Sequence, residues 1–497
     1  MFSARNVVAL SAFLFAGLAW ADSCDDIEAT SSIEVSRALS LSYIDERNDY
    51  WSTSCRALKP TCVVFPKSAE EVSVIVKILN NNTEPFATKS GGHSPNNYWS
   101  SVEGGPLIST QKLDQVTLDQ ETGICRVGPG QRLDSISAAL DGTGWTFVGG
   151  RIGNTGVGGL VLGGGLSYMS AQYGWSASSV IEYELVLANG TITTASATNN
   201  PDLFKSLKGG GNNFAIVVSY LLQTYHQGDV FGGNLFFHQS DKVATKLLKA
   251  VRDFTEYNTD DKAAVIVTAE RAPIDIIDSW ILFLFYDGSD VPEGIFKNFT
   301  DVGPFLDTTK VQSYADLMAG SNWVVLPDSV VTIATETIPI PSAADGEEIM
   351  GAIHGHWRNM TDKTELVAGI VASVAFQPFP KRIAQAALDK GGDLIDVDAD
   401  ADRMIIEMNY AFSLQSDYDK IDQIMQDTYG GVRERVLEYQ QEARLPDVYL
   451  PLFMNYAFFR QDYWGRLKPE NAAFAKTVAE QVDPDGFFRN RTGGWKP

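Results

Sequence analysis

The chain has 497 residues, of which 44% are hydrophobic, and its formal net charge at pH 7 is −23. This charge argues against nucleic acid and against an anionic membrane surface as partners, since both are themselves negatively charged. The length exceeds what one core of ordinary size requires, so two substantial domains are expected.

The first 21 residues have the pattern of a secretory signal peptide. Arg5 precedes an apolar run over residues 7–18, and residues 19–21 (Ala-Trp-Ala) give the small-x-small pattern of a cleavage site. The run is shorter than the roughly 20 residues that a membrane span needs, and acidic residues follow it at once. We therefore predict that residues 1–21 are removed, that the mature chain is secreted, and that it has no membrane anchor.

Cysteine usage agrees with an oxidising compartment but leaves the pairing open. The four cysteines are Cys24, Cys55, Cys62 and Cys125. One or two disulfides are expected in any of three complete pairings, and Cys125, within a strand-like run, is a candidate for a buried free thiol. Sequons predict N-glycosylation at Asn81, Asn189, Asn298, Asn359 and Asn490.

From residue 51 to about residue 227, short strand-like runs alternate with glycine turns and amphipathic helices. Ser68 and Glu71 form a capping box for a helix that runs to residue 79. The other predicted elements are strands over residues 62–66, 84–90, 106–109, 115–118 and 124–127 and helices over residues 133–140 and 201–207.

The stretch from about residue 228 to residue 448 has fewer glycines and longer strand-like runs, as at 264–267 and 280–285. Amphipathic helices such as 241–254 alternate with these runs, and a Pro-rich loop at 338–341 interrupts them. This pattern predicts an antiparallel sheet with helices on one face.

We therefore expect an α+β protein with three parts after the signal peptide. They are a first domain over residues 22–228, a substrate domain over 229–448, and a C-terminal segment over 449–497. The aromatic composition of the last segment predicts that it packs back on the first domain.

Glycine is concentrated between residues 149 and 165, where nine of the seventeen residues are Gly. This density implies positive φ angles or close approach of the backbone to a ligand, and N–H groups presented in this way can hold a pyrophosphate. The chain contains neither GxGxxG nor GxxxxGK, which excludes the Rossmann fingerprint and the P-loop. With a second glycine cluster at 209–211 and the turn at 91–94, the pattern predicts a long dinucleotide held by backbone contacts.

The order of these motifs resembles that of the FAD-linked oxidases of the berberine bridge enzyme-like group, and the resemblance covers essentially the whole mature chain. The motifs are Ser90-Gly91-Gly92-His93-Ser94, Gly128-Pro129-Gly130, 156–165, 184–190, 209–211 and the C-terminal block that begins Asn455-Tyr456-Ala457. The resemblance implies a two-lobed FAD-binding domain of the vanillyl-alcohol-oxidase (PCMH) type. It also implies a substrate domain whose antiparallel sheet is covered by helices, and FAD as the cofactor.

In this group the flavin 8α-methyl is joined to the histidine that His93 matches, and imidazole is a competent nucleophile. Many relatives add a second link through a Cys at the position of Ile152, and no cysteine follows residue 125. The resemblance therefore implies a single covalent bond, through His93. The chain departs from the group's pattern at Lys89, where Arg is usual, and at Leu160, where His is usual.

The resemblance also implies which residues surround the cofactor and the substrate. Those expected at the cofactor are His93, Lys89, Ser90, Gly91, Gly92, Ser94, Gly150, Gly153, Asn154, Gly156, Val157, Gly158, Gly159, Gly163, Ile216 and Val217. The catalytic candidates are Tyr456, its neighbour Asn455, and Tyr410 in the strand-like run 406–414, with Glu407 as a carboxylate alternative.

Enzymes of this group oxidise an alcohol, an amine or a C–H bond by moving a hydride to the flavin while a base takes a proton. Molecular oxygen then reoxidises the flavin and peroxide is released. A tyrosine base needs a pKa below its ordinary value of about 10, which a nearby cation or the flavin would provide.

Other hypotheses remain open at this point. The net reaction could be a cyclisation or isomerisation, or the fold could only bind a ligand, although the intact His93 and glycine loops argue against the latter. A carbohydrate oxidase is a further alternative, disfavoured because such enzymes carry the cysteinyl flavin link. We expect a small-molecule substrate, with a hydrophobic secondary metabolite preferred. His354 and His356 lie two residues apart, as on one strand face, without a matching third ligand, so no metal site is predicted.

Overall fold

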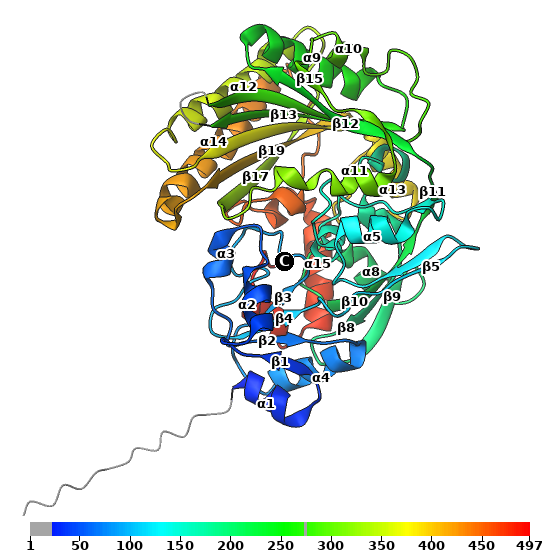
Figure 1. The fold of residues 1–497 in the computed structure, drawn as a ribbon, viewed down its shortest axis with the longest axis vertical. Helices are drawn as coiled ribbons and strands as arrows, with labels where there is room; N and C mark the ends of the chain where they lie inside the picture. Colours follow the sequence, from blue (N-terminus) through cyan, green and yellow to red (C-terminus); the bar gives the residue numbers. More distant parts are fainter. Residues whose placement is uncertain (1–21, 273–275) are drawn as a thin grey trace, which may run out of the picture.

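The computed structural model describes residues 22–272 and 276–497, and Figure 1 shows two lobes. The first domain and the C-terminal helix α15 (Pro469–Val482) form the lower lobe, and a large sheet with its helices forms the upper lobe. The predicted signal peptide lies outside the described residues, so its removal stays a prediction. No helix in the described part of the chain is long and apolar enough to cross a membrane.

Two small sheets organise the lower lobe. In the first, β2, β4 and β3 are parallel and β1 joins β2 antiparallel, whereas the second is antiparallel throughout. In spatial order the strands are β1 (Glu34–Ser36), β2 (Cys62–Phe65), β4 (Pro106–Ser109) and β3 (Ala87–Lys89), then β5 (Val116–Asp119), β6 (Ile124–Val127), β10 (Ile216–Gln223), β8 (Val180–Val186) and β9 (Ile192–Ser196).

Local sequence signals set the helices of this lobe. Helix α4 (Ala69–Leu79) begins where Ser68 Oγ accepts a hydrogen bond from the Glu71 N–H group (3.3 Å), as a capping serine should. Helices α5 (Leu133–Leu140) and α8 (Pro201–Leu207) have the predicted bounds. The glycine run is not entirely loop, because its middle forms the short helix α6 (Val157–Leu162).

The upper lobe contains one large antiparallel sheet, as predicted for this part of the chain. Its strands, in spatial order, are β15 (Leu306–Asp307), β12 (Val230–His238), β14 (Ile277–Tyr286), β13 (Ala263–Ala272), β18 (Val371–Phe379), β19 (Arg403–Phe412) and β17 (Val330–Pro339), with β16 (Lys310–Gln312) also paired to β12. Three helices cover one face: α9 (Asp241–Tyr257), α12 (Gly346–Asp362) and α14 (Tyr418–Gln441). Leu247, Trp357 and Val436 from these helices are buried in the core against that face, which leaves the opposite face for the lower lobe.

Two predictions about the upper lobe are wrong. Ile338 and Pro339 are not in a loop but end β17, and the proline is tolerated because β17 is an edge strand of the sheet. His354 and His356 lie on helix α12 rather than on a strand, and His356 Nε2 is hydrogen-bonded to the carbonyl of Thr428 (3.1 Å). Both histidines are buried packing residues, and the described residues contain no cluster suited to a metal.

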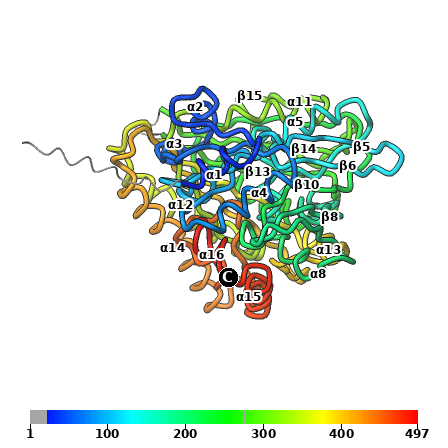
Figure 2. Tube along the Cα trace, turned by 90° about the horizontal axis from the view of Figure 1, so that it is seen from below, coloured from blue at the N-terminus to red at the C-terminus, as the bar shows by residue number. Residues whose placement is uncertain are grey.

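The C-terminal segment returns to the first domain, as Figure 2 shows for α15 and α16 (Phe487–Arg491). Phe487 packs on Phe86 with ring centroids 4.8 Å apart, and Arg491 Nε donates to the carbonyl of Glu84 (2.8 Å). The domain boundaries at residues 228 and 448 stay predictions.

The structure also resolves the cysteine pairing in the described part of the chain. Cys24 in helix α1 (Ser23–Thr30) is bonded to Cys62 in β2. Cys55 and Cys125 are buried free thiols, so one disulfide forms and the expected free thiol at Cys125 is confirmed.

Candidate active site

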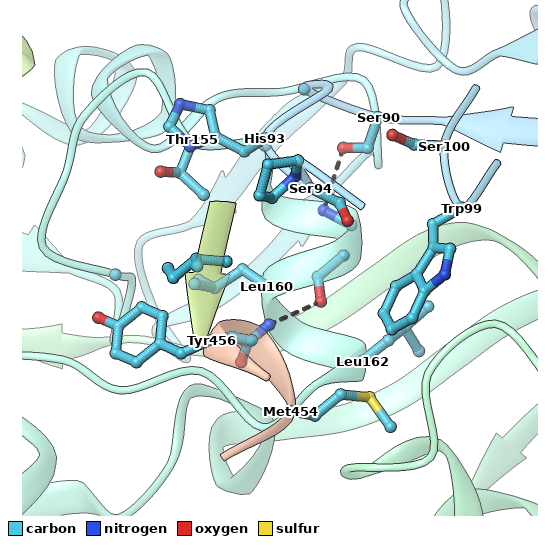
Figure 3. Close-up of a pocket in the computed structure, with 18 of the residues that line it drawn as sticks. Ser90, His93, Ser94, Trp99, Ser100, Thr155, Leu160, Leu162, Met454 and Tyr456 are labelled. Carbon is cyan, nitrogen blue, oxygen red and sulfur yellow. Dashed lines mark hydrogen bonds between the residues drawn. The ribbon is translucent and has the colours of Figure 1, made fainter. Parts of the chain in front are cut away.

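A cavity of about 390 Å³ lies between the lobes and is lined by all three parts of the chain. Its lower end is formed by the turn at 91–94, helix α6 and β10, and its upper end by the free face of the large sheet. The segment around Tyr456 closes one side, as Figure 3 shows. One continuous space therefore joins the predicted cofactor motifs to the predicted substrate domain.

The turn from Gly91 to Ser94 presents backbone donors to this cavity. None of its four N–H groups donates to another group within the described residues, although backbone N–H groups are normally paired. Gly92 has φ +66°, and a Cβ atom on Gly91 would lie 2.4 Å from the backbone nitrogen of Gly156. The turn thus forms a nest of unpaired donors, which we call the glycine cradle, and such a nest suits a pyrophosphate.

His93 is held at the cavity wall by its neighbours. Its ring stacks on Trp51 with centroids 5.3 Å apart, and its Nε2 is hydrogen-bonded to Asn154 Oδ1 (2.9 Å). Burial lowers the pKa of His93 to about 4, with Arg132 adding to this effect, so the imidazole is neutral at physiological pH. With Nε2 engaged by Asn154, Nδ1 is the ring nitrogen that has no hydrogen-bond partner in the described residues.

Most of the predicted cofactor residues line the cavity, but five do not. Those that line it are His93, Ser90, Gly91, Gly92, Ser94, Gly150, Gly156, Gly158, Gly159, Ile216 and Val217. Those that do not are Lys89, Gly153, Asn154, Val157 and Gly163. The structure places these five residues behind the cavity wall, and their contact with the cofactor stays a prediction.

The supporting residues have identifiable partners. Lys89 is 1% exposed and its Nζ contacts Glu46 Oε1 (2.8 Å), so it forms a buried ion pair under the turn. Val157 is fully buried in the core, and the space that a side chain at Gly163 would need is filled by the Asn455 amide. These contacts hold the backbone around the glycine cradle in place.

Four polar side chains meet above the cradle. Arg151 donates hydrogen bonds to the Tyr456 hydroxyl and to Gln377 Oε1, and Gln377 Nε2 donates to Glu407 Oε2 (2.7 Å). Burial raises the pKa of Tyr456 to about 12 even though the Arg151 guanidinium lowers it. Burial also raises the pKa of Glu407, while Arg151 opposes that rise. Arg151 is thus a nearby cation of the kind expected from the sequence, but burial outweighs its effect on the pKa, so Tyr456 is protonated at neutral pH.

Asn455 and Tyr410, the other predicted catalytic residues, have different surroundings. Asn455 lines the cavity, but its Oδ1 accepts from Gly165 N–H (3.0 Å) and its Nδ2 donates to the Gly159 carbonyl (3.2 Å). Its amide therefore anchors the C-terminal segment to the glycine run. Tyr410 is fully buried on the helix-covered face, where its hydroxyl is hydrogen-bonded to Thr428 Oγ1 (3.1 Å), and this corrects its assignment as a candidate base.

Several site residues were not singled out from the sequence. Arg151 lies beside Ile152 in the glycine run, and a cation among nine glycines was a signal that could have been used. Gln377 and Glu270 also line the cavity. Gln377 lies on β18 and Glu270 on β13, and successive side chains of a strand point to opposite faces of the sheet. These two residues could therefore be recognised only once the face of the sheet that meets the cavity was known.

Comparison with known proteins identifies the family. Residues 60–196 match the family model described as an FAD binding domain. An uncharacterized FAD-linked oxidoreductase of Arthroderma benhamiae is 40% identical over 467 residues, which cover 93% of this chain and 92% of that protein. This chain belongs to the FAD-linked oxidoreductases. FAD-dependent monooxygenase FUP4 of Fusarium proliferatum is 30% identical over 462 residues, with 90% and 86% of the two chains covered.

The fold of this FAD-linked oxidoreductase agrees with that assignment. Berberine bridge enzyme from Eschscholzia californica superposes with a TM-score of 0.76, covering 94% of this chain and 97% of that one, at 17% sequence identity. The α+β class and the resemblance to the berberine bridge enzyme-like group are thereby confirmed. The unpaired donors of the glycine cradle fit the pyrophosphate of FAD, so the residues present are suited to this cofactor.

The carboxyl group of Glu270 gives a pH-dependent prediction for the stability of this FAD-linked oxidoreductase. Burial raises its pKa from 4.5 to about 7. Between those values the folded state keeps a proton that the unfolded state loses, so the free energy of unfolding falls as pH rises. With allowance for partial exposure, the loss is about 2 to 3 kcal/mol by pH 8.

Glu270→Gln should therefore be more stable than the wild type at pH 8 and equally stable at pH 4, as measured by urea unfolding. The matched control is Glu347→Gln, which changes an exposed glutamate in the first turn of α12 and should show no such difference. A stability gain for Glu270→Gln that is the same at both pH values would contradict the prediction.

Proposed function

We propose that this chain is a secreted FAD-dependent oxidase that takes a hydride from an alcohol, an amine or an activated C–H bond of a small organic substrate. Molecular oxygen is the final electron acceptor and peroxide the product. The observation that carries the proposal is the continuity of the cavity. The glycine cradle and His93 line the same space as Tyr456, Gln377 and Glu407, so a substrate on the sheet face lies next to a cofactor held in the cradle.

FAD, when bound, supplies the hydride acceptor and passes the electrons to oxygen. We infer that it is attached covalently through His93 alone. Nδ1 of the neutral imidazole would replace one hydrogen of the flavin 8α-methyl, and the two electrons left on the flavin by this exchange would pass to oxygen. Cys55 and Cys125 are the two free thiols of the described chain, and neither lines the cavity, which supports a single link.

The network above the cradle supports a route for the proton that leaves the substrate. The Tyr456 hydroxyl lines the cavity and is linked to Arg151, while Glu407 holds a buried carboxyl group beside it. We infer that Tyr456 receives the substrate proton while its own proton passes to Glu407. Tyr456 thus ends neutral and Glu407 protonated, and Arg151 stabilises the partial negative charge on the tyrosine oxygen while both protons are in transit.

The cavity wall supports a largely apolar substrate, in line with a secondary metabolite. Ile266, Phe283 and Ile333 from the sheet and Val324 and Val325 beside it are among the lining residues.

Secretion and glycosylation are supported by the sequons, since the asparagine is exposed in each of the five. They are Asn81, Asn189, Asn298, Asn359 and Asn490.

A panel of alcohols, amines and polyketide-like compounds tests the proposal. With a true substrate, the flavin of the purified holoprotein should bleach under anaerobic conditions, and one peroxide should form per product when oxygen is admitted. Product formation without peroxide would indicate that the protein is a cyclase or isomerase and not an oxidase. If no compound reduces the flavin, the remaining hypothesis is that the protein only binds a ligand.

A further inference from the structure

Three polar side chains form a row across the free face of the large sheet. Glu270 on β13 is paired in register with Ser373 on β18, and Ser373 is paired with Asn409 on β19. All three line the cavity. Side chains paired across neighbouring strands lie about 5 Å apart, so the row presents a carboxylate, a hydroxyl and an amide side by side.

This row differs from the adjacent acid–base network in that its members are unpaired. Gln377 and Glu407 are hydrogen-bonded to each other, whereas the side chains of Glu270, Ser373 and Asn409 make no hydrogen bond or ion pair within the described residues. Burial alone accounts for the raised pKa of Glu270, with no charged neighbour contributing. Polar groups in such sites normally have partners, so these three are available to a ligand.

The charge of the cavity indicates what kind of ligand is complementary. Arg151, a cation of the cavity wall, is already hydrogen-bonded to Tyr456 and Gln377, and Glu407 is bonded to Gln377. The carboxylate of Glu270 therefore faces the cavity without a cation from the protein. A ligand with a positive charge and N–H donors would provide the counter-charge and the hydrogen-bond donors that this carboxylate lacks.

The rest of the face sets the shape of that ligand. Asn409 is two residues along β19 from Glu407, so the polar row lies about 7 Å from the acid–base network. Ile266 and Phe283 are paired in register at the far end of the face, and Phe283 stacks on Trp323, which is 46% exposed. The ligand is thus apolar at one end and cationic at the other, with the reacting carbon between them.

We propose that Glu270, with Ser373 and Asn409, is a recognition subsite for a protonated amine of the substrate. This inference rests on the proposed function, whose substrate it narrows to an amphipathic organic amine. In this subsite the ammonium group donates to the carboxylate of Glu270 and to the oxygens of Ser373 and Asn409. The ammonium group contributes to binding of the substrate and is not the group that is oxidised.

The test measures binding to the intact holoprotein, so it does not depend on turnover. Phenylalkylamines with two to four methylene groups are compared with the corresponding phenylalkyl alcohols by perturbation of the flavin spectrum and by thermal shift. The measurements are made at pH 8, above the pKa of about 7 of Glu270, where both partners are charged. At least one amine should bind about 10- to 100-fold more tightly than its alcohol, as a charge-assisted hydrogen bond requires.

Glu270→Gln should abolish this preference, Glu270→Asp should keep part of it, and the exposed control Glu347→Gln should keep all of it. No preference in the wild type, or an undiminished preference in Glu270→Gln, would overturn the proposal. If Glu270→Gln loses FAD, the proposal is decided by the comparison of amines with alcohols in the wild type and in Glu270→Asp. Failure of the proposed oxidase would appear differently, as a flavin that binds amines but is never reduced.

Discussion

His93→Ala is expected to abolish the covalent attachment of flavin while leaving FAD bound. The substitution removes the nucleophilic Nδ1 atom but leaves the unpaired donors of the glycine cradle, which hold the pyrophosphate by backbone contacts. Denatured wild-type protein should stay yellow, and mass analysis should find flavin on the peptide that contains His93. Denatured His93→Ala should be colourless, with all flavin released into the supernatant.

The folded His93→Ala protein should still oxidise substrate, but more slowly, because the 8α bond makes the flavin of this group a stronger oxidant. His226→Ala is a suitable control, since His226 is exposed and stacks on Trp145 away from the cavity wall. Its covalent flavin content should equal that of the wild type. Flavin that remains attached in His93→Ala would show that another side chain forms the bond.

Tyr456→Phe should slow flavin reduction by roughly 100- to 10,000-fold, because general acid–base catalysis typically accelerates a reaction by that factor. The change removes only the hydroxyl that lies between Arg151 and Glu407, so the ring still packs on Phe453, with centroids 4.8 Å apart. FAD content should therefore be unchanged. Anaerobic stopped-flow mixing with substrate measures the reduction rate directly.

Tyr410→Phe is the matched control for that experiment, because it removes a buried hydroxyl on the opposite face of the same sheet. It should cost about 1 kcal/mol of stability through the lost hydrogen bond to Thr428 and leave the reduction rate unchanged. A wild-type rate in Tyr456→Phe would mean that this tyrosine only packs, and Glu407 would become the first candidate base.

Elements with strong local signals could be predicted from the sequence with their bounds. The serine cap at Ser68, the proline at the start of α8 and the glycines around α5 mark these helices chemically, and the structure has them where expected. The glycine cradle was also predictable, since a backbone that must approach a ligand closely selects residues without a side chain.

Features that depend on long-range pairing could not be predicted in this way. Tyr410 and Glu407 occupy one strand, and only the packing of the covering helices decides that the carboxylate meets the cavity while the tyrosine enters the core. The partner of Cys24 and the support of His93 by Asn154 likewise depend on how distant segments meet. The sequence pattern carries the period of a strand but not the identity of its neighbours.

The return of the C-terminal segment to the first domain completes the cavity wall with residues from the last part of the chain. Phe488, Thr492 and Trp495 line the cavity, and Trp495 packs edge-on against Trp99 with centroids 4.0 Å apart. A ribosome that has completed residue 228 has made the glycine cradle but none of this wall. The first domain alone therefore has the backbone donors of the cradle but lacks part of the wall that surrounds them.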